Sequence, residues 1–270
     1  MNLVCGSRPT GAGRAYVAWP SRADRPLPVV LVVSDIWGDG DHLRDLTNRV
    51  AQSGYLAVAP DLYSSLPPSD ALAPRRVAAA RAWVDGLPPA TWTDATARSD
   101  ALAELGPLGA PLGETLDLLF EGAADLGQFD AILGEALTLA SAHDAGDHGP
   151  VGAIGFCMGG SLVGRLACDE ARLGAAVVFY GTAPPHEKLT GLDCPVLGLY
   201  GGEDHSITDA VPALADAMVS AGRRFEYHVY PGAPHAFFND TRSAYRVDAA
   251  RDAWVRALGF LSTELAGGRS

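Results

Sequence analysis

The stretch Val151-Gly152-Ala153-Ile154-Gly155-Phe156-Cys157-Met158-Gly159-Gly160 decides the fold of this chain. It starts as a continuous apolar run, as a strand buried on both faces does, and leads into a segment with helical spacing, Ser161 to Cys168. Cys157 lies where the two meet, with a glycine two residues away on either side. This pattern is a nucleophile elbow, a strand-to-helix turn whose glycines relieve crowding around a residue with a strained backbone. The stretch therefore predicts that the side chain at position 157 attacks a carbonyl carbon.

The tip of this turn carries a cysteine, where the motif usually has a serine. The helix-forming sequence after Cys157 places its sulfur near a helix N-terminus, and the positive end of a helix dipole favours a thiolate. For an isolated cysteine a buried, inert role is the usual interpretation, but the flanking glycines disfavour it here. A thiolate is a better nucleophile and a better leaving group than an alkoxide, so the turn suits substrates whose leaving group departs easily.

The alternation of short apolar runs with helical segments continues along most of the chain. Strands separated by helices form βαβ units, so we predict an α/β fold with a mostly parallel, doubly wound sheet and helices on both faces. The other predicted strands are Pro28 to Ser34, Tyr55 to Ala59, Gly174 to Tyr180, Pro195 to Tyr200 and Arg224 to Tyr230. The predicted helices are Asp41 to Gly54 and, approximately, residues 157 to 169, 208 to 222 and 243 to 265.

The region from Ser64 to Pro150 lacks strand character and is rich in alanine, leucine, proline and glycine. We expect Glu114 to Ala142 to be the long crossover helix that precedes the elbow strand. The divergent insertion at about 64–145 is interpreted either as a helical cap over the site or as a surface excursion. The length of 270 residues is compatible with one domain over residues 1–270.

Composition and charge exclude several classes of partner. The formal net charge of -12 disfavours nucleic acid, which requires a basic face, and also disfavours an anionic membrane surface. No apolar run approaches the length of a membrane span, and residues 1–10 lack the pattern of a secretory signal. We therefore expect a cytoplasmic protein that acts on a small molecule. The sequence leaves its oligomeric state open.

The cysteines and histidines do not form a recognisable metal motif. The four cysteines, at positions 5, 157, 168 and 194, have neither C-x-x-C nor zinc spacing. His143, Asp144, Asp147 and His148 occupy a glycine-rich connector, for which a solvated loop is the favoured interpretation. We expect no metal and no cofactor.

A thiol nucleophile requires a base and an acid that orients it, and after a nucleophile elbow the acid precedes the histidine in the chain. Asp204 follows the strand that ends at Tyr200, and His235 follows the strand that ends at Tyr230. Both therefore lie at the carboxyl ends of parallel strands, where open α/β sheets bind ligands. The rivals are Glu203 for the acid, and His205 and His228 for the base; strand alternation favours Asp204 over its neighbour.

The negative oxygen formed during attack on a carbonyl requires two amide donors. One is expected from Met158, the residue after the nucleophile. The other is expected from the loop that follows the strand at residues 28 to 34, with Ile36 as the most plausible donor.

Several segments, in this order, resemble the dienelactone hydrolase (carboxymethylenebutenolidase) family. They are Ser34-Asp35-Ile36-Trp37-Gly38, Gly54-Tyr55, Ala59-Pro60-Asp61-Leu62-Tyr63, Gly155-Phe156-Cys157-Met158-Gly159-Gly160, Tyr180-Gly181, Gly201-Gly202-Glu203-Asp204-His205 and Pro234-His235-Ala236-Phe237. The resemblance covers most of the chain except about Ser64 to Pro150. It implies an α/β-hydrolase fold, a Cys157-His235-Asp204 triad, and hydrolysis of an enol-lactone or activated ester through a thioester intermediate.

The chain departs from the family's pattern at positions around the nucleophile. A glutamate that bonds the resting thiol usually stands where this chain has Asp35, which is shorter by about 1.5 Å and is the candidate for gating the thiol. An arginine that holds the substrate carboxylate usually stands where this chain has Asn239, and Arg242 is out of register. In the divergent region Arg75, Arg76 and Arg81 are either substrate ligands or exposed helix charges. The substrate-binding candidates are Trp37, Phe237, Asn239 and Arg81.

Two classes of function follow from these residues. The first is a cofactor-free cysteine hydrolase of a small lactone or activated ester, with thioester hydrolysis or acyl transfer as near alternatives. The second is a non-catalytic binding protein on the same fold, since a fold does not determine a function. The complete set of nucleophile, base and acid favours the first.

Overall fold

An eight-stranded sheet organises the larger of two compact units in the computed structural model, which describes residues 2–88, 91 and 94–266. The larger unit is Met1–Ser65 with Phe129–Ser270, and the smaller is Leu66–Gln128. The strand order is β1-β2-β4-β3-β5-β6-β7-β8, with β1, β2 and β4 paired antiparallel and the remaining pairs parallel. The strands are β1 (Leu3–Pro9), β2 (Arg14–Pro20), β3 (Val29–Val33), β4 (Leu56–Pro60), β5 (Val151–Phe156), β6 (Leu173–Phe179), β7 (Val196–Gly201) and β8 (Phe225–Tyr230).

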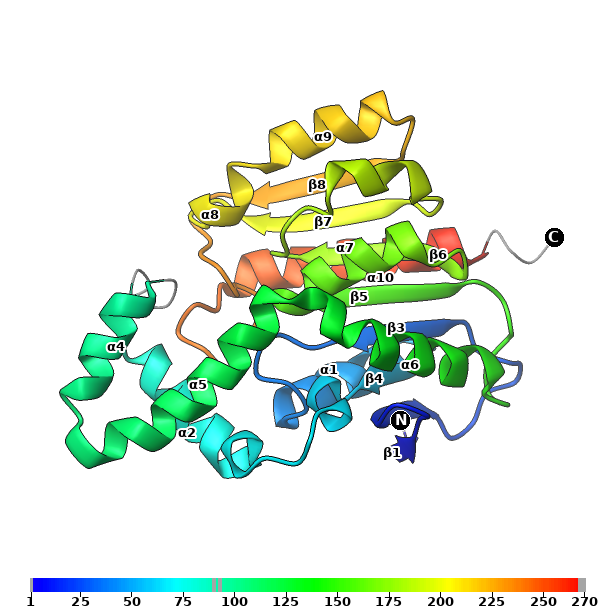
Figure 1. Ribbon diagram of the computed structural model, residues 1–270. Helices are drawn as coiled ribbons and strands as arrows, with labels where there is room; N and C mark the ends of the chain where they lie inside the picture. The colour runs from blue at the N-terminus through cyan, green and yellow to red at the C-terminus, as the bar shows by residue number, and fades with distance from the viewer. Residues whose placement is uncertain (1, 89–90, 92–93, 267–270) are drawn as a thin grey trace. The chain divides into compact units, whose positions relative to one another are not determined.

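Helices cover both faces of this sheet, as predicted (Figure 1). Helices α1 and α10 share one core cluster with alternate strand residues such as Val32, Ile154 and Phe179, while α6, α7 and α9 lie on the opposite face. Period-two alternation explains this arrangement, because central strands such as β3 and β5 are apolar and buried on both sides. The helices of this unit are α1 (Asp41–Gln52), α6 (Asp130–Ala142), α7 (Met158–Asp169), α8 (His205–Thr208), α9 (Val211–Ser220) and α10 (Val247–Ala266), with 3-10 turns η1 (Leu62–Ser65) and η5 (His186–Gly191).

Two features of the fold differ from the sequence prediction. Strands β1 and β2 were not predicted, because β1 is largely exposed and lacks a continuous apolar run. The single helix predicted over Glu114 to Ala142 is wrong, because the structure has α5 (Gly109–Ala124), a 3-10 turn η4 (Leu126–Phe129) and then α6. The break occurs at Asp125. Its side-chain oxygen Oδ1 accepts a hydrogen bond of 3.1 Å from the N–H of Gly127, and this local bond competes with the backbone hydrogen bonds of a helix.

The smaller unit is helical in its described part. Helices α2 (Pro74–Asp85) and α4 (Ala95–Ala103) both pack against α5. The guanidinium of Arg98 lies 4.1 Å from the centre of the Phe120 ring, and Arg76 forms an ion pair of 2.8 Å with Glu114. The remaining turns are η2 (Asp70–Leu72) and η3 (Gly106–Leu108). Between Ser64 and Pro150 the described residues contain no strand, and only an isolated bridge joins Leu27 to Gly146. The single-domain organisation and the cap interpretation stay predictions.

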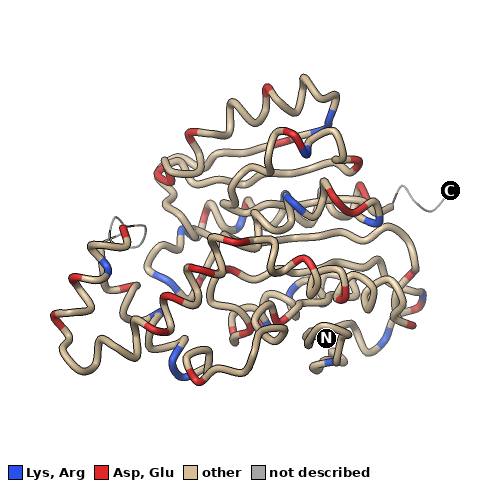
Figure 2. Tube along the Cα trace, viewed as in Figure 1, with Lys and Arg blue, Asp and Glu red and all other residues tan. Residues whose placement is uncertain are grey.

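Charged side chains are spread over both units. Figure 2 shows Asp and Glu on most helices and loops, with Lys and Arg interspersed among them. Many of the basic groups are paired with carboxylates, as in Arg14–Asp61 and Arg165–Asp130. Among the described residues no helix has the length and apolar character needed to cross a bilayer.

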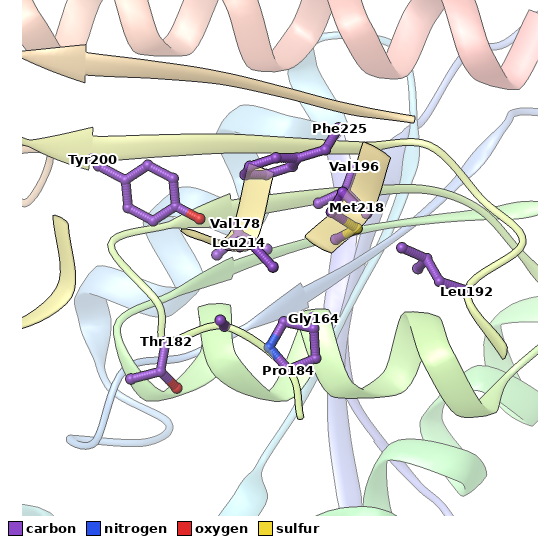
Figure 3. A pocket seen from close by; sticks show the side chains of 11 residues that line it. Gly164, Val178, Thr182, Pro184, Leu192, Val196, Tyr200, Leu214, Met218 and Phe225 are labelled. Carbon is purple, nitrogen blue, oxygen red and sulfur yellow. The ribbon is translucent and has the colours of Figure 1, made fainter. Parts of the chain in front are cut away.

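One small enclosed cavity lies inside the larger unit, between α7, α9 and the sheet (Figure 3). Its volume of about 10 Å³ is close to the space of one water molecule. Gly164 of α7 lines it, opposite Leu214 and Met218 of α9.

Candidate active site

The site lies at the point where the order of the strands reverses. After β3 the chain moves to β4 on one side, and it later returns to β5 on the other side of β3. Val33 pairs with Gly155, so the residues that follow β3 lie beside those that follow β5. In α/β sheets such a switch point leaves a crevice at the carboxyl ends of the strands. This topology brings Asp35 and Ile36 beside Cys157.

Cys157 adopts the strained backbone that the sequence predicts. Its φ of 55° and ψ of -118° fall outside the common regions for a residue with a side chain. The neighbouring backbone is closely packed: a Cβ on Gly155 would lie 2.1 Å from the carbonyl oxygen of Gly159, and a Cβ on Gly159 would lie 2.2 Å from that of Ser34. Only glycine fits at these two positions, which explains the spacing of the motif.

Hydrogen bonds hold the turn against the next strand. The N–H of Cys157 donates to the carbonyl oxygen of Phe179 at 3.0 Å. Ser161, in the first turn of α7, accepts hydrogen bonds from both the N–H and the hydroxyl of Thr182 at 2.8 Å. Contacts with β6 and with the loop that follows it therefore hold the backbone of Cys157 in its strained conformation.

His235 and Asp204 lie in contact, from loops after β8 and β7. The Nδ1 atom of His235 is 2.6 Å from Oδ2 of Asp204, and Oδ1 of Asp204 accepts a hydrogen bond of 3.1 Å from Ser206. Asp204 is buried, whereas the adjacent Glu203 is exposed. The carboxylate partner of His235 is thus Asp204.

The two rival histidines have other surroundings. His205 is exposed and lies 3.2 Å from Asp209, and His228 is in β8, where its ring packs 4.5 Å from that of Tyr230. His143 accepts the Ala145 N–H within the connector, and His148 Nδ1 lies 2.9 Å from the carbonyl oxygen of Ser141, in the last turn of α6. In the described part of the chain, no three His, Cys, Asp or Glu side chains are grouped as a metal would require.

The charge of His235 is set by its neighbours. Burial alone would lower the pKa of His235, but the negative charge of Cys157 and hydrogen bonds to Asp204 and Cys157 outweigh it and raise that pKa to about 10. The ring of Tyr180 packs edge-on, 5.0 Å from the imidazole. These contacts favour the charged imidazolium form of His235.

Replacing Cys157 with alanine should lower the pKa of His235 from about 10 toward the ordinary value of 6.5, because the largest favourable charge is removed. NMR titration of the imidazole measures this, with Cys168→Ala as a control that leaves the pKa unchanged. In the wild type the charged imidazole contributes to stability below pH 6.5, and the contribution is lost as pH rises through about 10. An identical His235 titration in the Cys157→Ala variant would contradict the interaction.

The two predicted oxyanion donors lie on either side of the strand switch point. Met158 follows the candidate nucleophile in the chain, and Ile36 lies across the switch point from it. Met158 is the first residue of α7, and Ile36 is in the loop after β3. Among the described residues neither backbone N–H has a hydrogen-bond acceptor. Their role in binding an oxyanion stays a prediction.

The predicted gating and substrate-binding residues have varied surroundings. Oδ1 of Asp35 accepts a hydrogen bond of 3.0 Å from the backbone N–H of Trp37. Phe237 is fully buried, with its ring between those of Tyr180 and Tyr230. Asn239 is buried and its Oδ1 accepts hydrogen bonds from the N–H and hydroxyl of Thr241. Trp37 is buried, and Arg81, in the smaller unit, lies 4.0 Å from Asp85. The functional roles of these residues stay predictions.

Two tyrosines beside the site were quoted in the sequence motifs but given no role. Tyr180 is buried, which raises its pKa well above the ordinary value together with the charges of Asp35 and Cys157, while Arg242 acts in the opposite direction. Tyr63 has a pKa raised by burial and by the same two negative charges, and its hydroxyl donates to the Ile36 carbonyl oxygen at 2.7 Å. The available signal was their position in the chain: Tyr180 directly follows β6, and Tyr63 lies in the turn η1 shortly after β4.

Comparison with known proteins identifies the family of this chain. The model of the dienelactone hydrolase family matches residues 14–105 and 114–265. The chain belongs to the dienelactone hydrolase family. The match extends through most of the Ser64 to Pro150 region, which the sequence motifs had left outside the resemblance; within that region only residues 106–113 are unmatched.

Similar members of the dienelactone hydrolase family come from distant organisms. A protein of Saccharolobus solfataricus named "Putative carboxymethylenebutenolidase" is 35% identical over 249 residues, covering 92% of this chain and 93% of that protein. A protein of Escherichia coli K12 with the same name is 32% identical and covers 90% of this chain and 80% of its own. A solved structure described as a "Putative Dienelactone Hydrolase" from Klebsiella pneumoniae is 31% identical, with a TM-score of 0.72 and coverage of 97% of this chain and 99% of that one. This dienelactone hydrolase family member is therefore a hydrolase with the α/β-hydrolase fold.

Proposed function

We propose that this protein is a cysteine hydrolase that cleaves a small lactone or activated ester through a thioester acyl-enzyme. Cys157 is the nucleophile and His235 is the general acid and base. Asp204 orients the imidazole and stabilises its protonated form. The observation that carries the proposal is the contact of 2.6 Å between His235 and Asp204, with the imidazole close enough to Cys157 for the charge of the sulfur to raise the pKa of His235.

The reaction has two halves. The Cys157 sulfur attacks the substrate carbonyl, and the negative oxygen is stabilised by the N–H groups of Met158 and Ile36. The carbon–oxygen bond to the leaving alkoxide or enolate then breaks, while the imidazolium of His235 gives that oxygen its proton. In the second half His235 takes a proton from water as the water attacks the thioester, and the carboxylic acid leaves as the sulfur regains its charge.

The mechanism favours esters and lactones over amides. A thiolate leaves more readily than an amine anion, so the intermediate formed from an unactivated amide returns to substrate. A good leaving group, such as an enolate or a phenolate, allows the intermediate to proceed instead. We therefore propose activated acyl compounds as the substrate class.

The proposal predicts an acetyl group on Cys157 when the enzyme is mixed with p-nitrophenyl acetate and stopped with acid after one turnover. Mass spectrometry of the intact protein and of its peptides locates the adduct, and the thioester should be lost on treatment with neutral hydroxylamine. Cys5 is exposed and serves as the internal control for unspecific acylation, while Cys168 and Cys194 are buried. Turnover with an adduct on another residue, or with none, would contradict the assignment.

A further inference from the structure

We propose that Asp35 and Tyr63 clamp the peptide between Ile36 and Trp37, and so act as positioning residues that aim the Ile36 N–H at the oxyanion. This inference rests on the proposed function. It assigns to Asp35 a different role from gating the thiol, and it gives Tyr63 a role in the reaction.

The clamp is visible as two hydrogen bonds on opposite ends of one peptide unit. The Trp37 N–H donates to Oδ1 of Asp35 at 3.0 Å, and the carbonyl oxygen of Ile36 accepts from the Tyr63 hydroxyl at 2.7 Å. A peptide unit is planar, so bonds at both ends fix its orientation. The Gly38 N–H also donates to the Asp35 carbonyl oxygen at 3.2 Å, which closes the turn. The preceding N–H, that of Ile36, is left without an acceptor in the described part of the chain.

Tyr63 is itself held firmly. A Cβ on Gly38 would lie 2.7 Å from the Tyr63 ring, so the ring fits only because residue 38 is a glycine. Gly38 also has a φ of +72°, a backbone conformation that favours glycine. On another side the ring packs edge-on against Phe129, 5.8 Å between centres. Burial, together with the negative charges of Asp35 and Cys157, raises the pKa of Tyr63, so its hydroxyl remains protonated and acts as a donor. The clamp is therefore set before any substrate binds.

The length of Asp35 suits this role. An aspartate oxygen bonds to the N–H two residues ahead in an Asx turn, and asparagine makes the same turn without a charge. A glutamate places its carboxylate one methylene further out and does not form this compact turn. Asp35→Asn therefore separates the clamp, which needs the oxygen, from gating of the thiol, which needs the charge.

The test compares Tyr63→Phe, Asp35→Ala and Asp35→Asn with the wild type, using p-nitrophenyl acetate for acylation and iodoacetamide for alkylation of Cys157. Iodoacetamide reacts by displacement of iodide at a saturated carbon and forms no oxyanion, so it reports on the nucleophile alone. Loss of an oxyanion donor lowers kcat by about 10²-fold or more, and we expect Tyr63→Phe and Asp35→Ala to lower kcat by about 10-fold to 10²-fold with KM unchanged. Asp35→Asn should keep nearly the full kcat, and all three should alkylate at the wild-type rate.

Three results would overturn the clamp. They are an unchanged kcat in Tyr63→Phe and Asp35→Ala, a parallel fall in the alkylation rate, and an Asp35→Asn variant as impaired as Asp35→Ala. Melting temperatures verify that each variant is folded, and Tyr63→Phe removes only one oxygen if Asp35→Ala is unstable. Failure of the proposed function would be seen separately, as acylation of wild-type enzyme at a residue other than Cys157.

Discussion

Cys157→Ala should lower kcat for p-nitrophenyl acetate and for a lactone panel by about 10⁶-fold, the scale seen when the nucleophile of a catalytic triad is removed. The reason is that Cys157 is the proposed nucleophile, and the two other members of the proposed triad, His235 and Asp204, are bonded to each other at 2.6 Å. Steady-state kinetics on purified protein measures the loss.

Matched cysteine variants make this result specific. Cys168 lies on the same helix, α7, but is buried, and burial raises its pKa above the ordinary value. Cys168→Ala should therefore keep nearly the wild-type rate, as should a change at the exposed Cys5. Cys157→Ser keeps the shape of the turn and should retain measurable but reduced activity, because His235 then has to deprotonate a hydroxyl.

The same experiment separates a hydrolase reaction from ligand binding. A binding protein on this fold would tolerate Cys157→Ala without a change in any slow background hydrolysis. Turnover by Cys157→Ala equal to that of the wild type would rule out Cys157 as the nucleophile. The chain would still belong to the dienelactone hydrolase family.

The sequence predicted the parallel part of the sheet because its strands are buried on both faces. Such strands read as continuous apolar runs, as in β3 and β5, and glycines mark the turn between β5 and α7. The antiparallel strands β1 and β2 were missed; β1 lies at the edge of the sheet, where a strand is held by backbone pairing and its largely exposed side chains carry a weaker pattern. The helix break at Asp125 was missed because the apolar pattern continues through it, while the decisive bond to the Gly127 N–H is local.

For the candidate site, spacing along the chain was informative only where one candidate residue follows the end of a strand. Cys157, Asp204 and His235 follow β5, β7 and β8 in this way. Their common position at the carboxyl ends of the strands was therefore predictable. The contact of Tyr63 with the Ile36 carbonyl oxygen depends on how the turn after β4 folds back toward the loop after β3. That contact is a property of tertiary packing, which a motif does not encode.

Gly159→Ala should destabilise the protein by about 3 kcal/mol, the upper part of the usual range for forcing an extra group into a packed core. The added methyl would meet the carbonyl oxygens of Ser34 and Val33, at 2.2 and 2.3 Å. These are backbone atoms at the end of β3, which is paired with β4 on one side and β5 on the other. The clash therefore has no flexible side chain to absorb it, and relief requires movement of the elbow or the sheet.

Gly164→Ala is the matched control, because it adds the same methyl to the same helix at a position with space. Its Cβ would lie 3.6 Å from Pro184 and 4.0 Å from Val178, ordinary contacts at the edge of the cavity of about 10 Å³. Replacing a helical glycine with alanine stabilises by about 0.5–1 kcal/mol where the backbone allows it. Thermal unfolding followed by circular dichroism should show a melting temperature lower by roughly 10 °C for Gly159→Ala and unchanged or higher for Gly164→Ala. Equal melting temperatures for the two variants would mean that the elbow can yield, and that the strain at Cys157 is not enforced by the packing of Gly159 against β3.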